Sequence, residues 1–147
     1  EGILELVLGL VIKLYAVNRK VCNLAISAEE TGADLIMMTC SSISPCAGIA
    51  CKMINIPLLK IDEVMVNKAV NLGKVIGVLA TSKTTLQPTT AFIKKVAKER
   101  KKDIFIKTYL YEEALKALVA GKDDEHDKII LEKISEISKE VDVIVLA

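Results

Sequence analysis

Short apolar runs alternate with longer amphipathic stretches along most of the chain, which is the pattern of strands alternating with helices. The runs are rich in Val, Ile and Leu, and each is too short for a stable helix. Each is bounded by polar residues, Gly or Pro. The pattern therefore predicts strands at residues 35–39, 57–61, 75–80, 104–109 and 141–147.

The segments before and between these runs keep the 3.6-residue period of helices that bury one face. Gly32, Gly73 and Gly121 are the expected stop signals, and Asp62 is an expected N-cap. Strands that alternate with helices predict an α/β fold with a mostly parallel sheet and right-handed crossovers. The expected helices cover residues 1–28, 45–55, 62–72, 87–100 and 111–120, with another from Asp123.

Composition and charge argue against several classes of function. The 147 residues are 52% hydrophobic and 3% aromatic, enough for one aliphatic-cored domain or two small lobes. A net charge of +1 argues against nucleic-acid binding, and the basic run Lys94–Lys102 is interpreted as a solvated helix end. The apolar run Ile3–Ile12 is shorter than the roughly 20 residues that span a bilayer.

Four cysteines without paired spacing are typical of a protein in a reducing cytosol, so a cytoplasmic protein without membrane partners is expected. No cysteine–histidine cluster has zinc-ligand spacing and no Gly-rich phosphate loop is present, so no metal or organic cofactor is expected.

Cys40 stands at the most informative position. It directly follows the expected strand 35–39, and Ser44-Pro45 is a helix-start signature because Ser caps orphan amides and Pro lacks an N–H. A thiol between a strand end and a helix start is stabilised as a thiolate, beside amides that bind anions. The alternative interpretation is a small buried hydrophobic residue.

A weak internal repeat places a second polar turn at an equivalent position. The sequence Thr-Cys-Ser-Ser after the first strand is echoed by Thr-Ser-Lys-Thr-Thr (Thr81–Thr85) after the strand 75–80. Ligands in open α/β sheets bind beyond the carboxyl ends of strands. Two such turns facing each other would form one site between two lobes, although the second set of hydroxyls also suits ordinary loop and cap positions.

These motifs together resemble the aspartate/glutamate racemase superfamily, which includes hydantoin racemases, arylmalonate decarboxylases and maleate isomerases. The resemblance runs from about Ser27 to the end. Four stretches carry it by their order and spacing: GADLIMMTCSS (32–42), IPLLKIDEVM (56–65), GKVIGVLATSKTTLQPT (73–89) and VDVIVLA (141–147).

The resemblance implies two flavodoxin-like parallel-sheet lobes related by a pseudo-twofold axis, with the substrate between them. Residues 1–66 would form part of the first lobe, with the Cys40 turn. Residues 67–147 would form the second, ending on a strand that leads back to the cleft. Because the family's opening strand is absent before Glu1, the fold is expected to be incomplete at both ends and the chain to be an internal segment.

The resemblance also implies the site. Cys40 matches the first catalytic cysteine, and the second would follow Leu146-Ala147, one residue beyond the given sequence. The positions that would hold the substrate carboxylate are Ser41, Ser42, Thr81, Ser82, Thr84 and Thr85. Of the other cysteines, Cys22 and Cys51 are expected in the core, and Cys46 is expected to have a packing role.

The implied activity is that of an isomerase: a cofactor-independent racemase that moves the α-hydrogen of aspartate, glutamate or a related small carboxylate through thiols. Two alternatives stay open. One is an arylmalonate decarboxylase-like or maleate isomerase-like enzyme that uses one cysteine, and the other is a carboxylate-binding module without chemistry. A homodimer is also left open.

Overall fold

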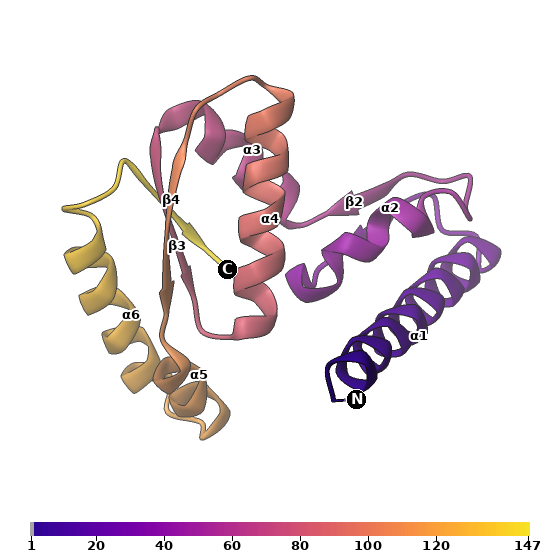
Figure 1. Ribbon diagram of the computed structural model, residues 1–147, viewed down its shortest axis with the longest axis horizontal. Coiled ribbons are helices and arrows are strands. Elements are labelled where there is room, and N and C mark those ends of the chain that lie inside the picture. The colour runs from indigo at the N-terminus through magenta and orange to yellow at the C-terminus, as the bar shows by residue number, and fades with distance from the viewer. Residues whose placement is uncertain (1) are drawn as a thin grey trace. The chain divides into compact units, whose positions relative to one another are not determined.

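The computed structural model describes the backbone of residues 2–147 and the side chains of residues 13–147. The chain forms two compact units, Glu1–Ile61 and Asp62–Ala147, each with its own parallel sheet. Figure 1 shows the elements in order along the chain. The α/β class expected from the alternating pattern is therefore confirmed. Whether the two units are the two lobes expected at 1–66 and 67–147 stays a prediction.

Unit 1 builds a two-stranded parallel sheet against helices. The long helix α1 (Gly2–Glu30) is followed by β1 (Ile36–Met38), a 3-10 helix η1 (Ser41–Cys46), α2 (Ala47–Ala50) and β2 (Leu58–Lys60). The helices bury small and aliphatic side chains against the inner face of β1. The buried set comprises Val21, Cys22, Ala25, Met38, Cys46, Ala47, Ala50 and Ile54.

Gly32 ends α1 as the sequence predicts. Its φ of 88° is in the left-handed region, where a Cβ is costly. The amide of Gly32 donates to the carbonyl of Glu29 (2.9 Å), and that of Ala33 donates to the carbonyl of Ala28 (3.3 Å). This pair of hydrogen bonds is a Schellman motif, and it turns the chain from α1 toward β1.

Unit 2 is organised around its central strand. β3 (Val75–Ala80) pairs in parallel with β4 (Phe105–Leu110) on one side and with β5 (Val143–Leu146) on the other. β3 is an unbroken apolar run, as expected for a parallel strand with both faces covered. Parallel pairing brings the carboxyl ends of β3 and β4 to the same edge of the sheet, with Ala80 opposite Leu110.

Helices cover both faces of this sheet. α3 (Asp62–Leu72) and α4 (Lys83–Glu99) bury their apolar stripes on one face of the sheet. The chain then forms α5 (Glu112–Val119) and α6 (Asp123–Ile137), which contact each other, and α6 lies on the opposite face of the sheet (Figure 1). The core between the sheet and the first pair contains Val66, Ala69, Val70, Ile76, Val78, Ile93, Val96, Ala97 and Val145. No helix among the described residues is long and apolar enough to cross a membrane.

The backbone before β3 lies close to the backbone before β5. The Asp142 carboxylate accepts hydrogen bonds from the amides of Lys74 and Val75, both at 2.8 Å, and these bonds lower its pKa. A Cβ added at Gly73 would lie 2.7 Å from Asp142 Cβ and 3.0 Å from Val143 Cγ2. Glycine is therefore the residue that lets these segments meet.

Two helix starts differ from the sequence prediction. The helix expected to begin at Pro45 with Ser44 as N-cap instead begins at Ser41 as η1, with Pro45 inside it, and α2 ends at Ala50. Small hydroxyl residues favour such tight local turns over a regular helix start. The helix expected from residue 87 begins at Lys83, because Ser82, five residues before residue 87, caps the helix by accepting a hydrogen bond from the amide of Thr84.

Candidate functional site

Cys40 lies just past the carboxyl end of β1 and is exposed. It occupies the N-cap position of η1 in an extended conformation (φ −112°, ψ 111°), and its carbonyl accepts a hydrogen bond from the amide of Ile43 (3.2 Å). Its side chain makes no capping hydrogen bond. The expected position at a strand end is confirmed, but the helical segment that follows is short and starts as a 3-10 helix.

The other cysteines divide into two buried and one exposed. Cys22 and Cys46 are buried in the unit 1 core. Burial raises the pKa of the Cys46 thiol, and the neighbouring Cys22 raises it further, so Cys46 stays protonated at neutral pH. Cys51 was expected in the core, but that prediction is wrong: Cys51 follows the end of the short α2 and is exposed.

Ser41 and Ser42 follow Cys40 as the first two residues of η1 and are partly buried. They lie in the same turn as the thiol, as the resemblance implies. Their predicted role in binding a carboxylate stays a prediction.

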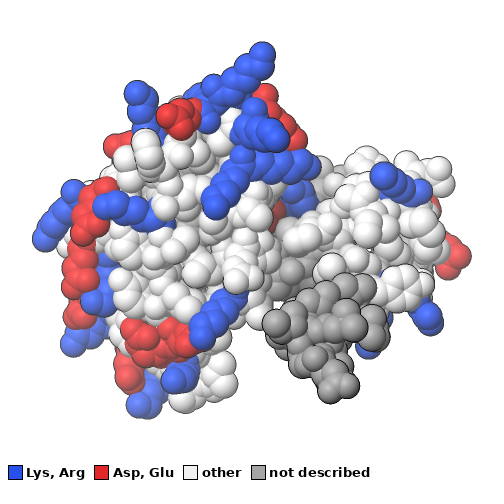
Figure 2. All heavy atoms as spheres, viewed as in Figure 1, with Lys and Arg blue, Asp and Glu red and all other residues white. Residues whose placement is uncertain are grey.

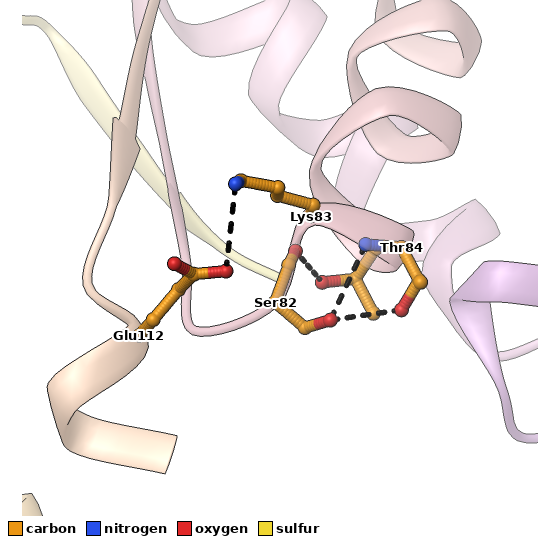
Figure 3. Close-up of polar contacts among 5 residues, drawn as sticks. Ser82, Lys83, Thr84 and Glu112 are labelled. Carbon is orange, nitrogen blue, oxygen red and sulfur yellow. Dashed lines mark hydrogen bonds and ion pairs between the residues drawn. The ribbon is translucent and has the colours of Figure 1, made fainter. Parts of the chain in front are cut away.

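In unit 2, Ser82 organises the hydroxyl-rich segment after β3 (Figure 3). Its hydroxyl accepts a hydrogen bond from the amide of Thr84 (3.2 Å) and lies 2.8 Å from Thr84 Oγ1. Thr85 Oγ1 donates to the Ser82 carbonyl (3.0 Å), whereas Thr81 precedes the cap and is partly buried. Four of the six predicted binding residues are therefore together, but three of them take part in capping α4.

A charge pair that the sequence prediction missed lies beside these hydroxyls. Lys83 Nζ is 3.9 Å from Glu112 Oε1, and the two side chains extend toward each other from the residues that follow β3 and β4 (Figure 3). A signal for it was present in the sequence. Glu112 follows its strand as closely as the hydroxyl residues follow theirs, at the edge of the sheet where ligands bind.

The basic run at the end of α4 lies at the opposite edge of the unit 2 sheet. Basic side chains gather there over the C-terminal end of α4 (Figure 2). Lys95 pairs with Glu99, and Lys102 Nζ donates to the carbonyls of Val70 and Asn71 at the end of α3. The basic residues of the run are exposed, which supports its interpretation as a solvated helix end.

Metal ligands are not clustered in the part of the chain that the structure describes: no group of three or more His, Cys, Asp or Glu residues is placed to hold an ion. The chemical groups at the strand ends are a thiol in unit 1 and hydroxyls, an ammonium and a carboxylate in unit 2. Thiols exchange protons near neutral pH, and hydroxyls with an adjacent cation bind carboxylates.

Comparison with known proteins identifies the family. No curated protein matches the chain in sequence. The family model described as Asp/Glu/Hydantoin racemase matches residues 13–147, and this range includes both the Cys40 turn and the hydroxyl-rich segment. With the parallel α/β units and the thiol and hydroxyls at their strand ends, this match shows that the chain belongs to the Asp/Glu/hydantoin racemase family.

Proposed function

We propose that this chain carries the first catalytic thiol and the carboxylate-binding residues of a cofactor-independent amino-acid racemase. The exposure of Cys40 just past the end of β1 is the observation that carries the proposal, and the resemblance implies that this residue matches the family's first catalytic cysteine. Cys40 takes the α-hydrogen from one face of a small amino acid such as aspartate or glutamate. A second acid on the opposite face returns a proton, and the configuration inverts.

The α-hydrogen of an amino acid is weakly acidic, so the carbanion needs donors on the neighbouring carboxylate. The carboxylate-binding residues in this proposal are Ser41 and Ser42 in unit 1 and Thr81, Ser82, Thr84 and Thr85 in unit 2. The cap around Ser82 supports this role, because it holds several hydroxyls in one place and in fixed orientations.

Among the four cysteines, accessibility favours Cys40 and Cys51. The buried Cys46 is a poor base because its pKa is raised and its thiol is covered. Cys51 is exposed, but it follows a helix rather than a strand. Cys51 is therefore the matched control for the role of Cys40.

Proton NMR in D₂O tests the proposal directly. The full-length protein is incubated with L-aspartate or L-glutamate, and loss of the α-hydrogen signal is followed together with appearance of the D-enantiomer. Cys40→Ser should lower both rates by about 10² or more, because an alcohol is a far weaker base than a thiolate at neutral pH. Cys51→Ser should leave both rates unchanged.

Three outcomes separate this proposal from the alternatives. Exchange that survives Cys40→Ser would refute the role of the thiol. Exchange without inversion would indicate a base on one face only. Release of CO₂ from an arylmalonate, without exchange on amino acids, would favour the decarboxylase.

A further inference from the structure

Lys83 and Glu112 bring opposite charges to the edge of the sheet where the hydroxyl-rich segment lies. Lys83 is the first residue of α4, directly after the capping Ser82, and Glu112 is the first residue of α5. Their strands are hydrogen-bonded neighbours, with Ala80 opposite Leu110. The pair therefore spans the gap between two strand ends, as Figure 3 shows.

The geometry of this pair leaves both charges available to a ligand. The separation of 3.9 Å is long for an ion pair, and the two side chains are 73% and 50% exposed. Exposed pairs of this kind contribute little to folding, because water solvates the separated charges almost as well. A ligand that supplies a charge to each partner can therefore replace the pair at small cost.

The two sides of the gap differ in charge. Residues 81–85 contain one cation, Lys83, and no acid, whereas residues 111–113 contain two acids, Glu112 and Glu113, and no cation. A carboxylate at the hydroxyls would be attracted by Lys83 and repelled by Glu112. A cationic group beside that carboxylate would remove the repulsion and gain an attraction.

We propose that Lys83 and Glu112 select a zwitterion: Lys83 pairs with the carboxylate of an α-amino acid, and Glu112 pairs with its ammonium group. This inference rests on the proposed function, because it places the substrate carboxylate at the hydroxyl-rich segment. It adds the residues that would set specificity, since carboxylates without an amine, such as malonates or maleate, would meet the Glu112 charge uncompensated.

A purely structural role for Glu112 predicts something different. An acid in the first turn of a helix interacts favourably with the helix dipole, so Glu112 would then contribute to the stability of α5 alone. Its neutralisation would lower the melting temperature and would not distinguish one ligand from another. The test therefore compares two ligands that differ in the amine only.

The experiment measures binding of L-glutamate and of glutarate to the full chain by ¹H–¹⁵N NMR titration. Unmodified protein should bind glutamate more tightly than glutarate. Glu112→Gln should weaken glutamate binding about three- to fivefold and leave glutarate binding unchanged or tighter. Lys83→Gln should weaken the binding of both ligands, whereas Glu113→Gln, the same charge change one residue further along the chain, should affect neither.

Several results would overturn the inference. They are equal affinity for both ligands, an equal loss of both in Glu112→Gln, the same selectivity loss in Glu113→Gln, or no binding of either ligand at millimolar concentration. Failure of the proposed function gives a separate signature. Selective binding that depends on Glu112, without α-hydrogen exchange, would refute the racemase and keep the zwitterion site.

Discussion

Replacing Gly73 with alanine tests the close approach between the starts of β3 and β5. The new Cβ would lie 2.7 Å from Asp142 Cβ and 3.0 Å from Val143 Cγ2, whereas carbon atoms pack best at about 3.5–4.0 Å. The backbone of one segment must therefore move by roughly 1 Å. That shift would also disturb the hydrogen bonds from Lys74 and Val75 to the Asp142 carboxylate.

The expected cost follows from two opposing effects. Overpacking of a tight contact costs about 1–3 kcal/mol, whereas loss of a glycine from the unfolded chain returns about 0.4–1 kcal/mol. The free energy of unfolding should therefore fall by about 1–2 kcal/mol for Gly73→Ala. With a urea m-value of about 2 kcal/mol/M, the midpoint should move down by roughly 0.5–1 M.

Urea unfolding followed by circular dichroism provides the measurement, with two controls. Gly48→Ala lies in α2, where an added Cβ meets no atom within 4 Å, so it should be neutral or stabilising. In an Asp142→Gly background, Gly73→Ala should cost less, because the closest atom is gone. A Gly73→Ala protein with an unchanged midpoint would refute the reasoning, and so would an equal loss in the Asp142→Gly background.

Two further predictions concern thiols and pH. Iodoacetamide at neutral pH should modify Cys40 and Cys51 in the folded protein, while the buried Cys22 and Cys46 should react only after unfolding. Peptide mass spectrometry identifies the labelled cysteines, and early labelling of Cys46 would contradict this prediction. The hydrogen bond from Lys107 at 2.8 Å lowers the pKa of Glu140, so this contact stabilises the fold above the carboxyl's unfolded-state pKa and is lost as pH falls through the folded-state pKa. Urea midpoints of Lys107→Met and the parent should therefore differ at pH 7 and converge at about pH 3, and a constant difference would be evidence against the contact.

The strands could be predicted from sequence because their signal is local. The run Val75–Ala80 is apolar throughout, and the structure has β3 over the same residues. Helix starts were less predictable, because two local signals compete at each one. Helices were expected to begin at Pro45 and at about Gln87, yet both residues lie inside helices that begin four residues earlier.

For the candidate site, the sequence predicted the position of its residues better than the contacts they make. The position of Cys40 at a strand end follows from the pattern of apolar residues alone. Whether a given hydroxyl caps a helix or is available to a ligand depends on where that helix begins. The sequence placed the start of α4 after Thr84 and Thr85, whereas both residues lie in its first turn. The sequence shows that Lys83 and Glu112 each follow a strand, but their pairing with each other depends on strand order, which no local pattern contains.

The order β4-β3-β5 has a consequence for how unit 2 folds. Val75 pairs with Phe105, 30 residues later, whereas Ile76 pairs with Val143, 67 residues later. Closing the longer loop costs more chain entropy, by roughly 0.7 kcal/mol, and β3–β4 pairing is therefore favoured first. Substitutions in the β3–β4 ladder should slow folding, whereas substitutions in β5 should mainly speed unfolding. The hydrogen bonds from the amides of Lys74 and Val75 to Asp142 would then form after the folding transition state. They would therefore set the unfolding rate of unit 2 rather than its folding rate.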